Sequence, residues 1–234
     1  MNFIQPSIDP VIFSLSFVEI RWYSLSYIFG LIFGFILIKN LNKTKGNLIS
    51  VQNLDNFFMW AVFGIILGGR IGYVIFYQFR FFLENPIYIF EIWNGGMSFH
   101  GGLIGLIVSI FIFCKINKIS FYYLSDLVSV VAPIGLFLGR IANFINTELI
   151  GRPTEFYISV IYPSVDNLPR HPSQIYEAFF EGFVLFIILF FYFIKKKNKY
   201  NYGFVSGLFL SLYAFFRFFI EFLREPDSHL GLFY

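Results

Sequence analysis

The stretch FFMWAVFGIILGGRIGYVIFYQF, residues 57–79, is a long apolar run that carries one charged residue, Arg70. A helix needs about 20 apolar residues to cross the hydrocarbon layer of a bilayer, and this run has that length. A charge inside such a helix is costly unless it faces a cavity or a partner. The stretch therefore predicts a membrane-spanning helix whose arginine points into the protein.

The composition of the whole chain agrees with this prediction. Of the 234 residues, 57% are hydrophobic, 23% are aromatic and only 13% are charged, which excludes an ordinary soluble domain. We predict an all-α fold, a polytopic membrane helical bundle that forms a single integral membrane domain over residues 1–234. We expect a short outer loop at 146–172 and no nucleic-acid partner. The six predicted spans are 22–38, 57–79, 98–114, 121–145, 173–194 and 203–223.

Three features refine this plan. Within the third span only residues 101–114 are strongly apolar and free of charge, so a short span and a re-entrant segment are both open. The first twenty residues contain Asp9 and Glu19 but no Lys or Arg, so we expect no cleaved signal peptide and a retained N-terminus. Cys114 is the single cysteine, which excludes an intramolecular disulfide and indicates a packed small apolar residue.

The lysines predict the orientation of the chain in the membrane. Short cytoplasmic loops carry an excess of Lys and Arg. All the lysines follow the first, third and fifth spans, so these connectors are predicted to face the cytoplasm and both termini to face outward. The lysines are Lys39, Lys43, Lys45, Lys115, Lys118, Lys195, Lys196, Lys197 and Lys199.

The arginines lie elsewhere, and three of them, Arg70, Arg140 and Arg217, fall inside predicted spans. A cation there costs about 2.5–3.5 kcal/mol even on a lenient insertion scale. The planar guanidinium can grip a phosphate or carboxylate with two hydrogen bonds. For Arg217 a structural salt bridge to Glu221, four residues along the same helix, is equally open.

Most polar residues of the spans fall at one predicted depth, that of the outer leaflet, which predicts a polar cavity opening toward that leaflet. We interpret Glu181 and Asp126 as helix-packing partners instead. Glycines flank several of the polar groups, which indicates either close helix packing or room for a bulky headgroup. The polar residues at outer-leaflet depth are Tyr23, Arg70, His100, Arg140, Asn143, Ser173, Gln174, Tyr176, Glu177, Tyr213, Arg217 and Glu221.

Five blocks of sequence, in order, resemble the prolipoprotein diacylglyceryl transferase family, and the likeness runs from near residue 9 almost to the end of the chain. Two departures are the short outer loop at 156–168 and a chain that stops at 229–234, where family members usually continue into a seventh span. The blocks are LGGRIGYVIFY (67–77), WNGGMSFHGGLIG (93–105), LGRIANFINTELIGRPT (138–154), RHPSQIYEA (170–178) and YAFFRFFIEFLREPD (213–227).

The resemblance implies transfer of a diacylglyceryl group from phosphatidylglycerol to the lipobox cysteine of a prolipoprotein, in the bacterial cytoplasmic membrane. The expected substrates are phosphatidylglycerol and prolipoprotein signal peptides, with membrane lipids as surroundings. We assign the catalytic role to His100, Arg217, Tyr23, Tyr213 and Glu221. We assign phosphatidylglycerol binding to Arg140, Asn143, Asn146, Glu148, Gly151 and Arg70.

This chemistry requires a base for the thiol and cations for the leaving phosphate. His100 is the candidate base, and an anchoring role for it in the glycine turn is equally open. No metal or organic cofactor is expected. Two other classes of protein remain as alternatives: a small secondary transporter or channel that uses intramembrane Arg, Glu and His, and a structural subunit whose buried charges pair with each other.

Overall fold

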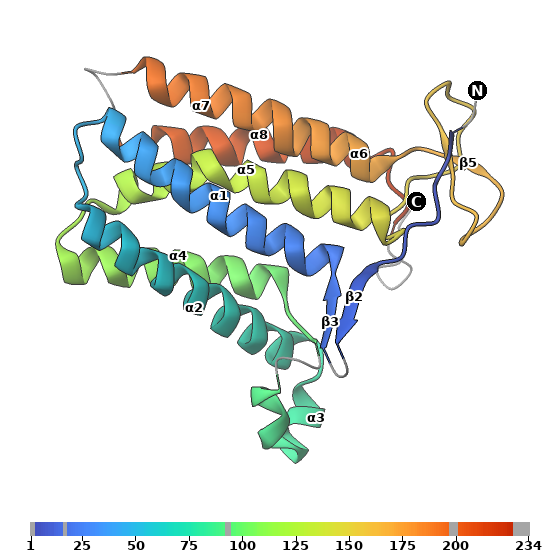
Figure 1. Ribbon diagram of the computed structural model, residues 1–234, viewed down its shortest axis with the longest axis horizontal. Helices are drawn as coiled ribbons and strands as arrows, with labels where there is room; N and C mark the ends of the chain where they lie inside the picture. The colour runs from blue at the N-terminus through green and yellow to red at the C-terminus, as the bar shows by residue number, and fades with distance from the viewer. Residues whose placement is uncertain (1–2, 16–17, 92–94, 197–200, 227–234) are drawn as a thin grey trace. The chain divides into compact units, whose positions relative to one another are not determined.

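The protein is described here by a computed structural model that covers residues 3–15, 18–91, 95–196 and 201–226 (Figure 1). Lys197 and Lys199 of the predicted cytoplasmic connector, Trp93 and Asn94 of the second family block, and the chain end from Asp227 lie outside the described residues.

Six helices are long and apolar enough to cross a membrane, which confirms the predicted polytopic helical bundle. The third predicted span is one continuous helix rather than an interrupted segment. The fifth is built from three consecutive segments, with a π-helical stretch between two α-helical ones. The six helices are α1 (Trp22–Thr44), α2 (Val51–Phe76), α4 (Phe99–Asn117), α5 (Phe121–Ile145), the run α6 (Ser173–Glu177), η3 (Ala178–Val184) and α7 (Leu185–Lys195), and α8 (Phe204–Glu221).

Some helices extend beyond the apolar runs that predicted them, because caps and hydrogen bonds decide where a helix ends. Helix α2 begins six residues before the predicted span, where the side chain of Ser50 accepts a hydrogen bond from the backbone N–H of Asn53 at 3.2 Å. Helix α1 continues through polar residues to Thr44. Hydropathy alone could not place either boundary.

The chain divides into two compact units, the first from residues 1–41 and 126–234 and the second from residues 42–125. The single membrane domain and the outer loop at 146–172 stay predictions.

In the first unit, helix α5 lies beside the helix formed by α6, η3 and α7 (Figure 1). Gly182 of η3 packs against α5 so closely that an added Cβ would lie 2.6 Å from the Cβ of Phe137. Leu127, Val130 and Leu185 form part of a fully buried apolar core. The interface thereby fixes how the polar ends of these helices face each other.

Short strands and loops lie at one end of α5 and α6 in the first unit (Figure 1). Strand β4 is the centre of a small sheet, pairing in parallel with β1 and antiparallel with β5. A separate antiparallel hairpin precedes α1. The strands are β1 (Phe3–Ile4), β2 (Val11–Leu15), β3 (Val18–Arg21), β4 (Val160–Ile161) and β5 (Pro169–Arg170).

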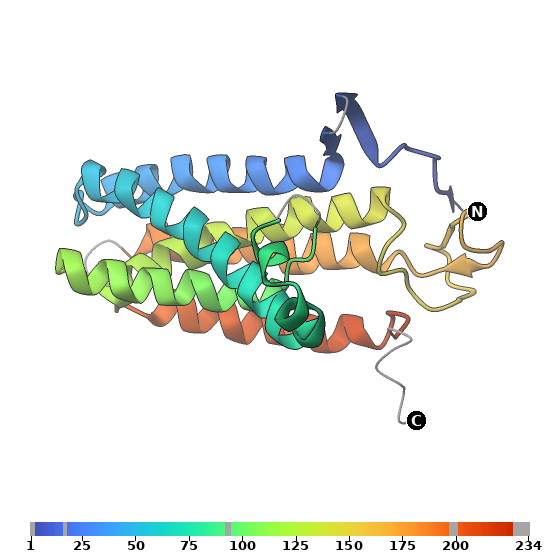
Figure 2. The ribbon, with the colours of Figure 1, turned by 90° about the horizontal axis from the view of Figure 1, so that it is seen from below.

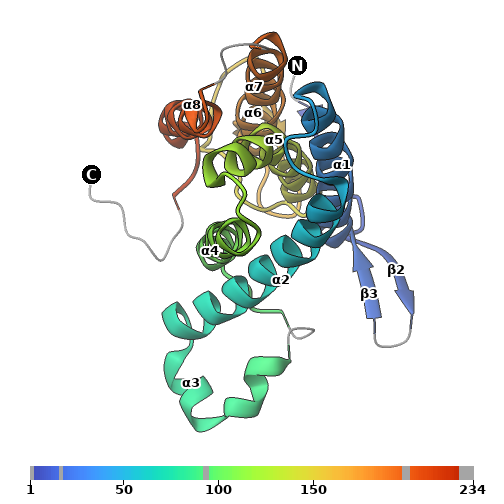
Figure 3. The ribbon, with the colours of Figure 1, turned by 90° about the vertical axis from the view of Figure 1, so that its left-hand side faces the viewer.

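The second unit is organised by the close crossing of α2 and α4 (Figure 2, Figure 3). An added Cβ at Gly72 would lie 2.7 Å from the Cα of Gly101, and one at Gly105 would lie 2.9 Å from the Cα of Gly68. Small residues therefore let the two backbones touch, as is common between membrane helices. Cys114, on α4, is buried as predicted. The short helices α3 (Phe79–Glu84) and η1 (Pro86–Phe90) follow α2.

Candidate active site

A buried carboxylate joins two arginines in the first unit. Glu177, the last residue of α6, is fully buried. Its Oε2 lies 2.9 Å from Nε of Arg140 on α5, and its Oε1 accepts a hydrogen bond from Nη1 of Arg217 on α8. Three helices thus meet at one carboxylate, directly before the π-helical segment η3. Segments of this kind occur frequently at functional sites.

More charged and phenolic groups surround this pair of arginines. Nη2 of Arg217 lies 2.5 Å from Oε2 of Glu221, so the predicted i, i+4 salt bridge is present. Glu181 is fully buried and lies 3.6 Å from Nη2 of Arg140, and neither of its oxygens has a hydrogen-bond partner among the described residues. Tyr213 is within electrostatic range of Glu181 and of both arginines.

The arginines keep donors for a further ligand. The described ion pairs of Arg140 use Nε and Nη2, and those of Arg217 use Nη1 and Nη2. No hydrogen bond that the structure describes uses Nη1 of Arg140 or Nε of Arg217. A guanidinium has five N–H donors, so the two side chains can hold an anion while they remain paired with Glu177.

The predicted substrate-binding residues at the end of α5 and in the loop after it come together around Glu148. Its two carboxylate oxygens accept from Nδ2 of Asn143 at 2.7 Å and from Nδ2 of Asn146 at 3.2 Å. The start of α6 holds the loop from the other side, because Ser173 Oγ donates to the Leu149 carbonyl and Gln174 Nε2 donates to the Glu148 carbonyl. The loop is thereby tied to the helix that carries Glu177.

Gly151 has a structural reason to be glycine. Its N–H donates to the carbonyl of His171 at 3.1 Å, and its backbone pairs with that of Arg224 beyond α8. An added Cβ would overlap the His171 carbonyl and lie 2.7 Å from the His171 Cβ. Gly151 therefore lets the loop after α5 approach both the start of α6 and the end of α8.

Arg170 fastens the same region. Its Nη1 donates to the Gly151 carbonyl at 3.0 Å and to the carboxylate of Glu225, and its Nη2 donates to Asp166 at 2.6 Å. The Arg170 guanidinium lowers the pKa of Asp166, and Asp166 in turn raises the pKa of Arg170. These contacts fix the end of α8, the helix that carries Arg217.

Tyr23 is not in direct contact with the arginines. Its hydroxyl lies 3.1 Å from that of Tyr27, one turn further along α1. Tyr27 is within electrostatic range of Arg140 and Glu148. Tyr23 is thus connected toward these charged groups through a second tyrosine, Tyr27, for which the sequence predicted no role.

His100 and Arg70 belong to the second unit, so they are described apart from the residues above. His100 is the second residue of α4, and its ring is exposed. The turn is instead capped by Ser98, whose hydroxyl accepts from the Gly101 N–H at 3.2 Å. No hydrogen bond to another described residue holds the imidazole, whose ring meets that of Phe99 edge to face with 5.7 Å between the centroids. The base and the anchoring role both stay predictions.

Arg70 does not fit the substrate-binding role that we expected. The side chain is buried, and all five of its N–H donors point at backbone carbonyls of the connector that precedes α4. The acceptors are Tyr88, Ile89, Glu91, Gly95 and Gly96, at 2.5–3.2 Å. A guanidinium with every donor occupied has none left for phosphate. Arg70 organises this connector instead.

The glycines and the acidic packing partners are also placed by the structure. The glycines beside Arg70 and His100 serve helix packing, as described above, whereas an added Cβ at Gly139, beside Arg140, would meet nothing within 4 Å. Asp126 accepts from the backbone N–H groups of Gly203 and Ser206, both at 2.7 Å, so it caps the start of α8. This confirms Asp126 as a helix-packing partner.

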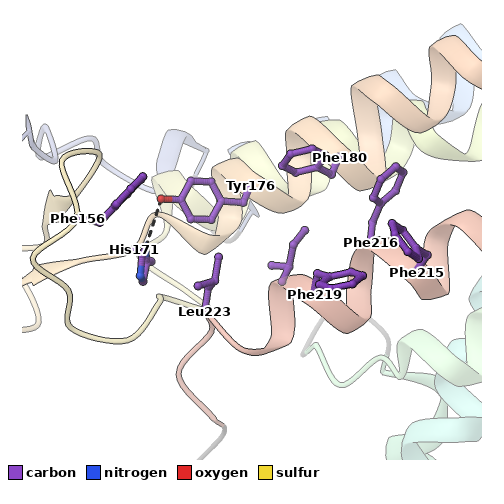
Figure 4. Close-up of a pocket in the computed structure, with 9 residues that line it drawn as sticks. Phe156, His171, Tyr176, Phe180, Phe215, Phe216, Phe219 and Leu223 are labelled. Carbon is purple, nitrogen blue, oxygen red and sulfur yellow. Dashed lines mark hydrogen bonds between the residues drawn. The ribbon is translucent and has the colours of Figure 1, made fainter.

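An apolar cavity of about 670 Å³ lies between α8 and the helix formed by α6 and η3 (Figure 4). Phe180, Phe216 and Phe219 line its length, and His171 and Tyr176 lie at one end, with 3.3 Å between His171 Nδ1 and the Tyr176 hydroxyl (Figure 4). Burial lowers the pKa of His171, which keeps the imidazole neutral near pH 7.

The sequence predicted Glu177 at outer-leaflet depth without a role in the site, and the structure places it between Arg140 and Arg217. Its signal was present: two carboxylates four residues apart, Glu177 and Glu181, in an otherwise apolar span. Such a pair needs cations nearby, and the intramembrane arginines were the available ones. Arg170 carried no such signal, because it lies outside the spans and its partners come from three separate loops.

These features define a multi-pass membrane protein with a buried arginine and carboxylate site. The family model for prolipoprotein diacylglyceryl transferase matches residues 10–233. The chain is 49% identical to the phosphatidylglycerol–prolipoprotein diacylglyceryl transferase of Rickettsia felis, over 97% of this chain and 87% of that protein. It is also 49% identical to the proteins of that name from Pseudoalteromonas atlantica and Pasteurella multocida, over 99% of this chain and 81% and 85% of theirs. The chain belongs to the prolipoprotein diacylglyceryl transferase family.

Proposed function

We propose that this protein transfers the diacylglyceryl group of phosphatidylglycerol to the lipobox cysteine of prolipoproteins, the first step of bacterial lipoprotein maturation. The observation that carries the proposal is the pair of arginines, Arg140 and Arg217, joined through buried Glu177 with donors left over. Family membership and relatives named for this reaction support it.

In the proposed reaction a thiol sulfur attacks a glyceryl carbon of the lipid. A carbon–sulfur bond forms, the bond from that carbon to the phosphate oxygen breaks, and glycerol phosphate leaves with the electron pair. Negative charge gathers on the leaving oxygens, where Arg140 and Arg217 stabilise it. Their shared partner Glu177 fixes both guanidinium groups before the lipid arrives, which lowers the cost of ordering them.

The thiol proton goes to a base, for which we propose His100. A thiol has an ordinary pKa of about 8.5 and becomes a strong nucleophile only as thiolate. The exposed ring of His100, which no described hydrogen bond occupies, supports this role.

The remaining residues position the lipid in this proposal. Asn143, Asn146 and Glu148 form one hydrogen-bonded set at the end of α5, the helix that carries Arg140, and Gly151 allows the following loop to pack against α6 and α8. Glu221 orients Arg217 through the ion pair between them. Tyr213 and Tyr23 are proposed to contribute hydroxyl groups at the edge of the site.

We propose the bacterial cytoplasmic membrane as the location, with the N-terminus on the outer side. The distribution of lysines supports this orientation. Prolipoprotein signal peptides and phosphatidylglycerol are the proposed partners. Family membership gives no support to the transporter or channel alternative.

A transfer assay tests the proposal. Membranes that contain the chain are expected to move labelled diacylglyceryl from phosphatidylglycerol to a lipobox peptide. His100→Ala and Arg217→Ala are expected to lower the rate while the protein still inserts. Absence of transfer by the unmodified chain would exclude the proposed activity, and unchanged turnover in both variants would remove these two residues from the site.

A further inference from the structure

A second, smaller cavity lies in the first unit at the end of α5, beyond the charged site. We call it the outer pocket and define it by Gln5, Ser7, Ile8, Asn146, Thr147 and Ser164, which line it together with prolines and Ile145. Its volume is about 290 Å³. All of its lining residues except Ile145 lie outside the six long helices, and none carries a charge.

Hydrogen bonds hold the walls of the outer pocket in place. Gln5 Nε2 donates to the Phe144 carbonyl at 2.5 Å, and the Thr147 hydroxyl donates to Gln5 Oε1 at 3.1 Å. Thr147 has a φ of 59°, which is strained for a β-branched residue. The N-terminal segment is also anchored by the pairing of β1 with β4. The pocket is therefore a built feature of the fold.

The outer pocket offers polar groups that lack partners. The backbone of Ser7 and Ile8 is exposed, lies outside helix and strand, and makes no hydrogen bond within the described part of the chain. Free backbone groups on an exposed segment can pair with an extended peptide.

The position of the pocket relative to the charged site sets which part of a substrate can reach it. Arg140 and Asn146 lie six residues apart along α5 and its end, which is about 9 Å of helix. An extended peptide covers that distance in about three residues. A chain whose cysteine thiol reacts near Arg140 can thus place its next residues in the outer pocket.

We propose that the outer pocket binds the second to fourth residues after the modified cysteine of the protein substrate and selects uncharged ones. The proposal rests on the proposed transferase function and adds a specificity site to it. No lining side chain can neutralise a charge, and the two nearby carboxylates are already engaged. Asp9 accepts from the Val11 N–H at 2.8 Å, and Glu148 accepts from Asn143 and Asn146. An acidic substrate residue would therefore lose part of its hydration in the pocket without gaining a cationic partner.

A peptide series tests the pocket with the full chain in membranes that contain phosphatidylglycerol. The parent lipobox peptide carries serine at the second, third and fourth positions after the cysteine. Each variant peptide carries aspartate at one of these three positions. A further peptide carries aspartate about eight residues after the cysteine. We expect aspartate at any of these three positions to lower kcat/KM about tenfold, because its carboxylate exchanges water for a pocket that offers no cation. The distant aspartate should have no effect.

A change of charge on the enzyme provides the matched control. Ser164 lines the pocket and is exposed, whereas Val165, the next residue, is exposed outside it. We expect Ser164→Arg to recover the aspartate peptides by roughly three- to fivefold, as for a partly exposed ion pair, and Val165→Arg to leave the ratio unchanged. Equal modification of all peptides, or equal effects of the two variants, would overturn the proposal. Failure to modify even the parent peptide would overturn the transferase function as well.

Discussion

Replacing Glu177 with glutamine removes the negative charge that joins Arg140 and Arg217 and keeps the volume of the side chain. The carboxylate is fully buried and makes one close contact to each arginine. Hydrogen bonds to charged groups contribute about 1.5–3 kcal/mol each, and breaking a buried ion pair costs about 3–5 kcal/mol. The side chains of Arg140 and Arg217 are 17% and 24% exposed, so water relieves part of this cost.

We therefore expect Glu177→Gln to lower the free energy of unfolding by about 2–3 kcal/mol. For a chain of this length each kcal/mol corresponds to about 2–4 °C in Tm, so the expected decrease is roughly 4–12 °C. The assay is thermal unfolding of the purified protein in detergent, with transferase activity measured on the same samples. Activity should fall further than stability alone explains, because both arginines lose their common anchor.

Glu181→Gln is the matched control, since Glu181 is equally buried on the same helix. Its oxygens have no hydrogen-bond partner in the described structure, and its nearest described cation is 3.6 Å away. Neutralising it removes a charge that burial disfavours, so Tm should stay the same or rise. A decrease in Tm for Glu181→Gln as large as that for Glu177→Gln would refute the reasoning.

Three further outcomes are expected. Gly72→Ala should destabilise the protein, because the added Cβ would lie 2.7 Å from the Cα of Gly101. Gly207→Ala, whose added Cβ meets nothing within 4 Å, should be neutral or stabilising by up to about 1 kcal/mol. Thermal unfolding compares the two variants. Burial lowers the pKa of His171 in the folded protein, so the free energy of unfolding should fall as pH drops below the unfolded-state pKa of about 6.5. His171→Phe should flatten this pH dependence between pH 7.5 and 5.5, and an unchanged slope would contradict the prediction. In a Cys114→Ser background, an impermeant thiol reagent should label a cysteine at Asn167 but not one at Lys43 in intact cells, and the reverse pattern would invert the proposed orientation.

The helices could be predicted from the sequence because a bilayer imposes a length and a composition on each span. The clearest case is the fourth span, predicted at 121–145, which coincides with α5 at both ends. The helix ends set by caps, such as that at Ser50, were not visible in hydropathy. The short strands at the end of α5 depend on pairing between residues as distant as Phe3 and Val160, which no local pattern encodes.

The sequence predicted which residues form the site better than it predicted what each of them does. Arg140, Arg217 and Glu221 share one charged cluster, as the depth argument indicated. Arg70 satisfied the same depth argument, but its N–H donors point at carbonyls of a connector. Local sequence does not reveal whether a buried arginine will meet a ligand or backbone carbonyls.

The most direct measurement is diacylglyceryl transfer from phosphatidylglycerol to a lipobox peptide by the unmodified chain and by Arg140→Lys, at equal abundance in the membrane. Lysine keeps the charge but loses the planar fork, and the lost charge-assisted hydrogen bond corresponds to about 1.5–3 kcal/mol, or a roughly ten- to hundredfold lower rate. We predict robust transfer by the unmodified chain and that loss in the variant. No transfer by the unmodified chain would contradict the proposed function, and near-normal transfer by Arg140→Lys would show that Arg140 does not grip the phosphate.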